Sequence, residues 1–248
     1  MELPYSSCYC EENIYKALEI LHSHWTGAGD CSLYSVFISS PTRAIPLFCQ
    51  RSSPRENGLV IWDYHVVLLK VVKDKTYVLD FDTTIQADNE QLNVRDGLRR
   101  VEFLQFGEYA ELTFRPSLSL PKNLQRSFRM IAAQDYLSSF ASDRSHMLAP
   151  AESTGQVYVK APPPWPQICG ANAAAAGVRM NIDCFIDVKL DSSKLNRQQV
   201  LESHGMRFGE VLTQEQFFGS LSPAKCIDLR SCLMRLDIER GTLSYANI

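Results

Sequence analysis

The sequence lacks the long hydrophobic run that a membrane-spanning helix requires, about 18 consecutive apolar residues. Its most apolar stretch, residues 66–72, is short and contains Lys70. The first residues also lack a positively charged segment followed by an apolar one, which is the pattern of a secretory signal. We therefore expect that the chain is not an integral membrane protein and that it is located in the cytosol.

A large excess of either charge is also absent. The 248 residues include 25 Lys and Arg against 28 Asp and Glu, a formal net charge of −3. This balance gives no broad attraction to nucleic acid or to anionic lipid, so we expect neither as a partner. The sequence has no phosphate-binding loop, dinucleotide fingerprint or solenoid repeat. A hydrophobic fraction of 45% predicts one folded domain over residues 1–248, with residues 219–248 as a C-terminal extension.

The cysteines suggest neither a disulfide framework nor a metal site. A reducing compartment keeps most thiols free, so we expect no structural disulfide. Cys8 and Cys10 with His22 and His24 would supply four metal ligands. Residues two apart on a helix point in different directions, however, and the spacing fits no common zinc site, so we expect no metal and no cofactor. The cysteines are Cys8, Cys10, Cys31, Cys49, Cys169, Cys184, Cys226 and Cys232.

The order of predicted elements in the first third of the chain favours an α+β fold. Apolar residues at helical spacing after Cys10, with Glu11 and Glu12 in the first turn, predict a helix that begins there. Four strands follow, and a short polar turn at residues 73–75 joins the last two into an antiparallel hairpin. The four predicted strands are residues 33–38, 45–49, 59–72 and 76–81.

The second half of the chain has weaker patterns. Residues 128–131 fit a strand and residues 135–140 fit a helix. The alanine-rich stretch 171–178 has the character of an insertion. Thr213 and Gln216 fit a capping box that opens a short helix.

The strongest chemical signal is Cys10 at the head of its helix. Backbone N–H groups and the helix dipole at that position favour a thiolate, which would lower the thiol pKa from about 8.5. A nucleophile fits such a position. The alternative is that Cys10 is a packing residue, as most cysteines in a chain of this kind are.

His65 is the best candidate for a base to activate that thiol. It lies inside an apolar stretch, where a titratable ring must be hydrogen-bonded or functional. Reflecting position 65 about Lys73 in the predicted hairpin reaches position 81, one residue from Asp80. Asp80 and Asp82 alternate along the strand and share a face, so either carboxylate could orient the imidazole. The alternative is a hydrogen-bonded core histidine without a catalytic role.

A second polar cluster lies at residues 142–146 and contains Asp143, Arg144 and His146. Asp143 could pair with a substrate ammonium or with Arg144, or the segment could be a solvated loop. Ser145 and His146 are neighbours in the chain, but such adjacency rarely gives the geometry of a hydrolytic dyad.

Six short blocks of the sequence occur together in a recognisable order. They are residues 5–14 (YSSCYCEENI), 60–69 (VIWDYHVVLL), 79–83 (LDFDT), 140–147 (FASDRSHM), 162–166 (PPPWP) and 180–182 (MNI). With these blocks the chain resembles the protein N-terminal glutamine amidohydrolase family over roughly residues 5–218. Several blocks together are far more specific than any single motif.

The resemblance implies an α/β sandwich of the papain-like and transglutaminase-like kind, with a mainly antiparallel sheet flanked by helices. It assigns Cys10 as nucleophile, His65 as base and Asp80 as the orienting carboxylate. It also implies a monomer of the cytosol and nucleus that deamidates N-terminal glutamine of proteins and so feeds the N-degron pathway. The substrate's α-ammonium would need an acidic or carbonyl-rich subsite, for which Glu12, Asp63 and Asp143 are the acidic candidates.

Other functions fit the same residues. A Cys-His-Asp site could serve a cysteine protease or a transglutaminase, in which an amine accepts the acyl group from the thioester. A protein-binding module without catalysis is a third alternative, with the proline-rich segment as its contact surface. Release of ammonia, cleavage of peptide or cross-linking to an amine would separate these functions.

Overall fold

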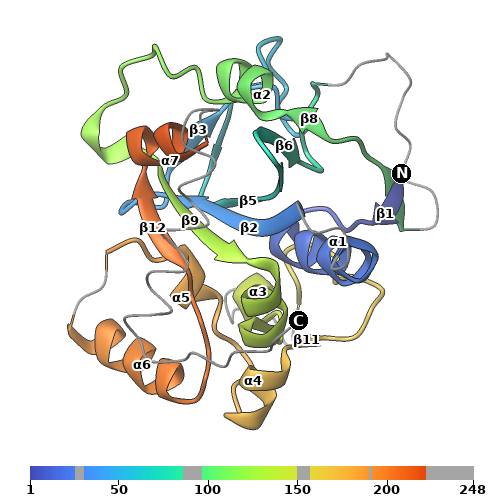
Figure 1. Ribbon diagram of the computed structural model, residues 1–248, viewed down its shortest axis with the longest axis vertical. Coiled ribbons are helices and arrows are strands. Elements are labelled where there is room, and N and C mark those ends of the chain that lie inside the picture. The colour runs from blue at the N-terminus through green and yellow to red at the C-terminus, as the bar shows by residue number, and fades with distance from the viewer. Residues whose placement is uncertain (26–30, 86–96, 150–156, 190–191, 222–248) are drawn as a thin grey trace.

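The computed structural model describes residues 1–25, 31–85, 97–149, 157–189 and 192–221. Its centre is a six-stranded sheet, and every neighbouring pair of strands in it is antiparallel (Figure 1). The predicted mixed fold, with a mainly antiparallel sheet flanked by helices, is confirmed. In sheet order the strands are β12 (Glu210–Thr213), β9 (Ser127–Ala132), β2 (Cys31–Ser39), β5 (His65–Val72), β6 (Lys75–Leu79) and β8 (Leu104–Gln105).

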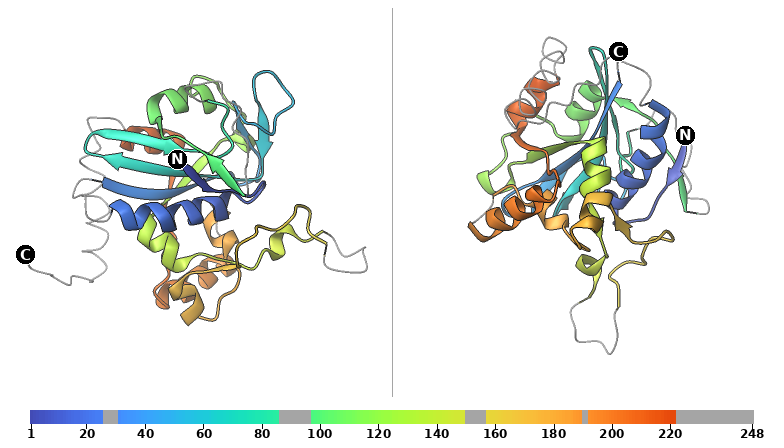
Figure 2. Two further views of the ribbon diagram at one scale, coloured as in Figure 1. Left: turned by 90° about the vertical axis from the view of Figure 1, so that its right-hand side faces the viewer. Right: turned by 60° about the horizontal axis from the view of Figure 1, so that its bottom comes forward.

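The central strands are apolar on both faces because both faces of the sheet are covered. In β5, Val66 and Leu68 belong to one hydrophobic core, whereas Val67 and Leu69 belong to a second core on the opposite side. Successive side chains of a strand point to opposite faces, so an uninterrupted apolar run such as residues 66–69 indicates a strand buried on both sides. Figure 2 shows the sheet edge-on between its two layers.

The first layer contains helices α1 (Cys10–Trp25), α3 (Ala133–Ser139) and α5 (Ile182–Ile186). The Phe185 ring of α5 stacks on Phe37 of β2, with ring centroids 5.4 Å apart. Helix α1 begins at Cys10, as predicted, and its buried side chains Ile14, Ala17 and Leu18 face the sheet. Helix α4 (Ala171–Ala175) packs on α3 from the outside.

The second layer contains helices α2 (Phe106–Thr113) and α7 (Gln214–Ser220). Phe128 of β9 stacks on Phe217 of α7 with ring centroids 4.3 Å apart. The capping box predicted at the start of α7 is confirmed, because the Thr213 hydroxyl accepts from the Gln216 backbone N–H while the Gln216 side chain accepts from the Thr213 N–H. This layer also includes the two-stranded sheet of β3 (Ile45–Leu47) and β4 (Val60–Trp62).

The remaining elements are short or lie at the periphery. They are β1 (Glu2–Pro4), β7 (Leu98–Arg100), η1 (Lys122–Leu124), β10 (Ala141–Ser142), η2 (Ser145–Met147), β11 (Ile168–Cys169) and α6 (Ser192–Ser203).

The strand predicted over residues 59–72 is two strands in the structure. Strand β4 pairs with β3, whereas β5 pairs with β2 and β6 in the central sheet. The chain changes sheets at Asp63 and Tyr64, where the Asp63 carboxylate accepts a hydrogen bond from the Tyr64 backbone N–H. A continuous apolar run does not reveal such a break, because both segments have buried residues. The break is important because it places Trp62, Asp63 and His65 around one corner.

The alanine-rich stretch 171–178, which has the character of an insertion in the sequence, begins with helix α4. At Gly170, just before it, an added Cβ would come within 2.5 Å of the Leu137 carbonyl oxygen, so glycine permits α3 and α4 to approach closely. The predicted extension 219–248 is described only as far as Leu221, and residues 222–248, including Cys226 and Cys232, lie outside the described residues. The six cysteines that are described are free thiols. Within the described ranges, none of the helices has the length and apolar character needed to cross a membrane.

Candidate active site

The position of Cys10 is fixed by the loop that precedes α1. The Asn13 side chain accepts from the Ser6 backbone N–H at 2.7 Å and donates to the Ser6 carbonyl at 2.9 Å. Cys8 lies between them in the chain with a φ of +66°, in the left-handed region. Together these features turn the chain sharply into the helix, so that Cys10 occupies its first position.

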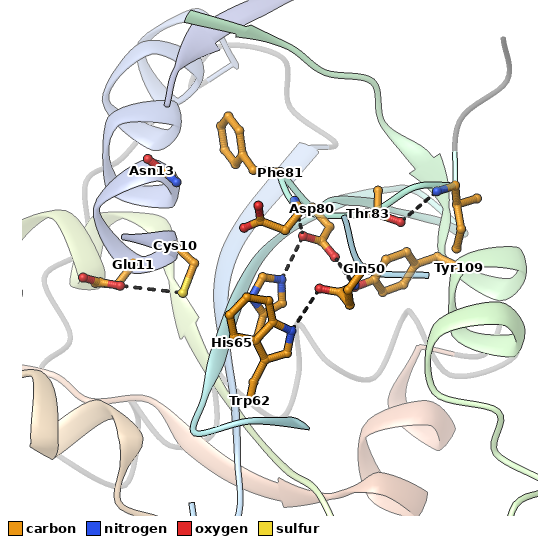
Figure 3. Close-up of polar contacts among 12 residues, drawn as sticks. Cys10, Glu11, Asn13, Gln50, Trp62, His65, Asp80, Phe81, Thr83 and Tyr109 are labelled. Atoms are coloured by element: carbon orange, nitrogen blue, oxygen red, sulfur yellow. Dashed lines mark hydrogen bonds and ion pairs between the residues drawn. The ribbon is translucent and has the colours of Figure 1, made fainter. Parts of the chain in front are cut away.

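His65 and Asp80 form a buried pair, as predicted. The His65 Nε2 atom lies 2.8 Å from Asp80 Oδ1, and both side chains are at most 1% exposed (Figure 3). The hairpin register pairs Leu68 with Leu79 and, continued by three residues, sets position 65 opposite position 82. Asp80 nevertheless reaches the imidazole because β6 ends at Leu79 and the chain bends there. Because Nε2 faces Asp80, Nδ1 is the ring nitrogen that remains for a proton exchange with a nucleophile.

A set of polar side chains holds this pair in place. Asp80 Oδ2 accepts from the Tyr109 hydroxyl at 2.8 Å and from Gln50 Nε2 at 3.4 Å. The Trp62 indole donates to Gln50 Oε1 at 3.1 Å and stacks on the His65 ring at 5.6 Å between centroids. Stacking on Trp62 therefore fixes the plane of the imidazole, and the hydrogen bond to Asp80 fixes the position of its Nε2 atom.

The pKa values of the pair are shifted in opposite directions. Burial by itself would raise the pKa of Asp80, but the charge of His65 and hydrogen bonds from His65, the Asp82 N–H and Tyr109 lower it below its usual value. Burial opposes a charge on His65, yet the Asp80 carboxylate outweighs it and raises the pKa of His65. The arrangement therefore favours an imidazolium beside a carboxylate, the state that forms when a base has taken a proton.

Cys10 and His65 line the same cavity of about 300 Å³, and Figure 3 shows Cys10 at the start of α1 with His65 on the neighbouring strand. The two residues come from different layers, since Cys10 begins α1 and His65 begins β5. The cavity is lined by Cys8, Cys10, Arg43, Trp62, Asp63, Tyr64, His65, Asp82, His146, Met147, Ile182, Asp183 and Ile186.

The thiol of Cys10 has acidic surroundings. It donates to Glu11 Oε2 at 3.6 Å, and the fully buried Glu11 carboxylate also accepts from the Tyr64 hydroxyl at 2.9 Å. Burial and then the charge of Glu11 raise the pKa of Cys10 well above its ordinary value, with smaller contributions from Asp82 and Asp63, whereas a backbone hydrogen bond from Val66 lowers it. The expectation that the helix terminus lowers this pKa is therefore wrong for the protein without substrate.

The three predicted substrate-binding carboxylates lie in different places. Asp63 is exposed and lines the cavity. Glu12 is fully buried and accepts from the Arg144 guanidinium at 3.0 and 2.9 Å, from Ser142 at 3.0 Å and from Trp165 at 2.8 Å. Asp143 accepts from the Ser145 backbone N–H and is not among the lining residues. The structure therefore brings one of the three, Asp63, to the cavity with Cys10 and His65.

Asp82 also lines the cavity but is held by other groups. Its Oδ1 accepts from the Tyr5 hydroxyl at 2.9 Å and lies 3.4 Å from the Arg99 guanidinium. Burial and the neighbouring Asp80 raise the pKa of Asp82, although His65 partly opposes them. Of the two alternating carboxylates, Asp80 is the one hydrogen-bonded to His65.

A metal ion would compete for the same atoms. Among the described residues, His65, Asp80 and Asp82 are the group of possible ligands that lies close enough, with ligand atoms within 4.8 Å of one another. The His65 Nε2 and Asp80 Oδ1 atoms are hydrogen-bonded to each other, so a metal would have to break the pair. In the Cys8, Cys10, His22 and His24 set considered above, His22 Nε2 bonds to Gln134 at 3.0 Å, and the His24 side chain lies outside the described part of the chain.

Sequence reasoning missed several residues of the site. Glu11 was interpreted only as a favourable first-turn acid, and Gln50, Tyr64 and Tyr109 carried no signal because their partners are distant in the chain. His146 was discounted as a neighbour of Ser145, yet it lines the cavity with Nε2 3.4 Å from Glu11 Oε1. A buried histidine near the nucleophile could have been suspected only from the motif block at residues 140–147.

Comparison with known proteins gives a consistent result. The sequence profile of the N-terminal glutamine amidase family matches residues 5–221. The protein N-terminal glutamine amidohydrolase of Homo sapiens is 37% identical over 186 residues, 74% of this chain and 78% of the relative. The proteins of that name from Caenorhabditis elegans and Drosophila grimshawi are 34% and 36% identical, covering 67% and 66% of this chain and 78% and 71% of their own lengths.

Proposed function

The chain belongs to the N-terminal glutamine amidase family, and we propose that Cys10, His65 and Asp80 are the residues that carry out its reaction. It is an amidohydrolase that converts an N-terminal glutamine of a protein to glutamate and releases ammonia. The observation that supports the assignment best is the 2.8 Å contact of Asp80 with His65, the histidine that lines the same cavity as Cys10.

The first half of the reaction forms a thioester. The Cys10 S–H bond breaks as its proton moves to His65 Nδ1, and the sulfur attacks the carboxamide carbon of the substrate side chain. Asp80 holds the ring by Nε2 and stabilises the imidazolium. The imidazolium returns the proton to the departing nitrogen, so ammonia leaves and a γ-glutamyl thioester of Cys10 remains.

The second half consumes one water molecule. His65 takes a proton from the water as the oxygen attacks the thioester carbon, and the C–S bond breaks to give the glutamate side chain and the Cys10 thiol. Both halves pass through an oxyanion. Backbone N–H groups at the start of α1, including that of Cys10, are its natural hydrogen-bond donors.

Asp63 is the residue we assign to the substrate's α-ammonium. It lines the cavity, and the structure gives it no ion-pair partner among the described residues. Glu12 and Asp143 are not assigned this role, because Glu12 is committed to Arg144 and Asp143 lies away from the cavity wall.

The broader assignments rest on the same family membership. A cysteine that begins a helix packed on an antiparallel sheet, with histidine at the start of β5 and aspartate just after β6, supports a papain-like and transglutaminase-like core. A single catalytic domain over residues 1–248 acting as a monomer in cytosol and nucleus is part of the proposal. Its product, an N-terminal glutamate, is the substrate expected for the N-degron pathway.

A panel of matched peptides tests the function. Peptides with glutamine first, glutamine second, asparagine first or acetylated glutamine first are incubated with the enzyme, and ammonia and peptide mass are measured. The first peptide alone should release ammonia and gain about 1 Da, because amide-to-acid exchange replaces NH₂ with OH. Turnover of internal glutamine, cleavage of the backbone or coupling to an added amine would assign a general deamidase, a protease or a transglutaminase instead.

A further inference from the structure

The cavity beside Cys10 has one carboxylate whose charge is not balanced by an ion pair. Asp63, Asp82 and Asp183 line the cavity. Arg43 pairs with Asp183 at 2.8 Å, and the Arg99 guanidinium lies 3.4 Å from Asp82. Asp63 is therefore the lining aspartate without an ion-pair partner among the described residues, and its charge disfavours a thiolate at Cys10.

Glu11 adds a buried charge on the other side of the sulfur. Its Oε1 atom has no hydrogen-bond partner among the described residues, although His146 Nε2 lies 3.4 Å away. Its Oε2 atom accepts from Cys10 and Tyr64. In the protein without substrate the Cys10 proton thus has a carboxylate as its acceptor, and a second negative charge on the sulfur would be repelled.

The two histidines near Cys10 each lie beside a carboxylate. Although burial opposes a charge on either ring, Asp80 raises the pKa of His65 and Glu11 raises the pKa of His146, so a charge on either ring is balanced by its own partner. Tyr64 and Tyr136 are buried and neutral, because burial raises the pKa of each well above its ordinary value.

We infer that the α-ammonium of the bound substrate supplies the missing positive charge and so converts Cys10 from a thiol to a thiolate, with His65 taking the proton. This inference rests on the proposed function and adds a reason for its selectivity. Asp63 seats the ammonium on the cavity wall. A blocked or internal glutamine brings no such charge, so it meets a cysteine that is still protonated. Recognition of the free terminus is then part of activating the nucleophile as well as of binding.

The charge of the bound ammonium should raise the fraction of Cys10 that is a thiolate. A unit charge about 6 Å from the sulfur at an effective dielectric constant of about 20 changes the thiolate fraction about 100-fold. When the pKa of a thiol falls, its thiolate becomes intrinsically less nucleophilic, and this lowers the alkylation rate about tenfold. The net acceleration expected for an added electrophile at pH 7 is therefore about tenfold, with the midpoint of the pH profile lowered by about 2 units.

The experiment measures alkylation of Cys10 by iodoacetamide, located by mass spectrometry, across pH 5 to 10. The protein is saturated with an alanine-initiated tripeptide amide, which has a free α-ammonium but leaves the space of the glutamine carboxamide open. Saturation is judged by competition against ammonia release from a glutamine-initiated peptide. The acetylated alanine peptide at the same concentration is the matched ligand control.

The free-amine peptide should speed alkylation about tenfold and the acetylated peptide should not. Asp63→Asn should lose the acceleration, whereas Asp143→Asn, the same change outside the cavity, should keep it. Glu11→Gln should speed alkylation of the ligand-free protein, and circular dichroism checks that this variant is folded.

Equal effects of the two peptides, or absence of competition by the alanine peptide, would overturn the inference. Ammonia release from the glutamine-initiated peptide in the same samples separates the two proposals. If ammonia is released normally while alkylation is unaffected by the free amine, the proposed function stands and the activation by ammonium is wrong.

Discussion

The Asp80 carboxylate stays ionised although it is buried, because it accepts four hydrogen bonds. They come from His65 Nε2, the Asp82 backbone N–H, the Tyr109 hydroxyl and Gln50 Nε2. A buried carboxylate without such donors would take up a proton and could no longer stabilise an imidazolium. Asp82, by contrast, is bound to Tyr5 and Arg99 and contributes to the field of the cavity.

Asp80→Asn should therefore be far more damaging than Asp82→Asn. An amide cannot stabilise the imidazolium and can select the wrong tautomer of His65, so kcat for ammonia release should fall about 10⁴-fold, as the same replacement does in a Ser-His-Asp triad. KM should change little, because the substitution alters neither the residues that contact the peptide nor Asp63, the residue proposed to bind the α-ammonium. The control, Asp82→Asn, should retain most of the activity. A reversal of the two effects would show that Asp82 is the orienting residue.

The pair also predicts how stability depends on pH. The pKa of Asp80 is lowered in the folded protein, so its contribution is present above the unfolded value near 4 and is lost as pH falls through the folded pKa. The pKa of His65 is raised, so its contribution is present below the unfolded value near 6.5 and is lost as pH rises through the folded pKa.

Urea unfolding of the wild type and Asp80→Asn at several pH values checks this sign. The difference in unfolding free energy should be largest between about pH 4 and pH 6.5 and should shrink on either side. A difference that grows steadily above pH 8 would mean that His65 is not charged beside Asp80.

At the level of single residues, the sequence predicted the helix start at Cys10 and the contact between His65 and Asp80, but not the surroundings of these residues. A helix start, an apolar strand and a hairpin each leave a local pattern. Glu11 and His146 leave none, since their contact joins positions 135 residues apart through the tertiary fold. Burial and then the charge of Glu11 raise the pKa of Cys10, so a rule based only on the helix terminus gave the wrong sign.

The elements that position the site are held by one buried charge network. Arg144 has a φ of +66°, binds both oxygens of Glu12 on α1, and also donates to the carbonyls of Pro163, Trp165 and Pro166. The proline-rich segment is thereby tied to the helix that carries Cys10. This is why the motif blocks at residues 140–147 and 162–166 occur together with the block around Cys10.

Arg144→Met should consequently destabilise the fold. It leaves the fully buried Glu12 carboxylate without its partner, which costs about 3–5 kcal/mol of unfolding free energy. Arg43→Met is the contrasting variant. Arg43 is exposed, its partner Asp183 is exposed and its partner Asp187 keeps Lys194, so the loss should be about 1 kcal/mol or less. Urea unfolding at pH 7 measures both losses. Equal losses would indicate that Glu12 is not held as a structural charge.

Strand and helix positions were largely predictable, because the buried residues of both cores recur at regular spacing along the chain. The helix after Cys10, the hairpin and the capping box at Thr213 are confirmed. The division of residues 59–72 between two sheets was not predictable, since partner choice is decided by β2 and β3 rather than within the run. Helix α4 was missed because its five residues are stabilised by packing on α3 and not by a long periodic pattern.

At the scale of the whole molecule, the site is assembled from segments throughout the described chain. The cavity takes residues from the N-terminal loop, the β4–β5 corner, the end of β6, η2 and α5, from Cys8 to Ile186. Both layers of the fold contribute, because Cys10 belongs to the first layer while Asp80 is held by Tyr109 of the second. The reaction therefore depends on the docking of both layers against the sheet, which no single motif could reveal.

The central claim is that Cys10 is the nucleophile of an N-terminal glutamine deamidation. The most direct measurement is ammonia release, with peptide mass, from a glutamine-initiated peptide by the wild type, Cys10→Ala and Cys169→Ala. Cys169 is exposed and lies outside the cavity, so its replacement is the matched control. The wild type and Cys169→Ala should release ammonia at similar rates, whereas Cys10→Ala, folded by circular dichroism, should release none above background. Normal ammonia release by Cys10→Ala would contradict the account.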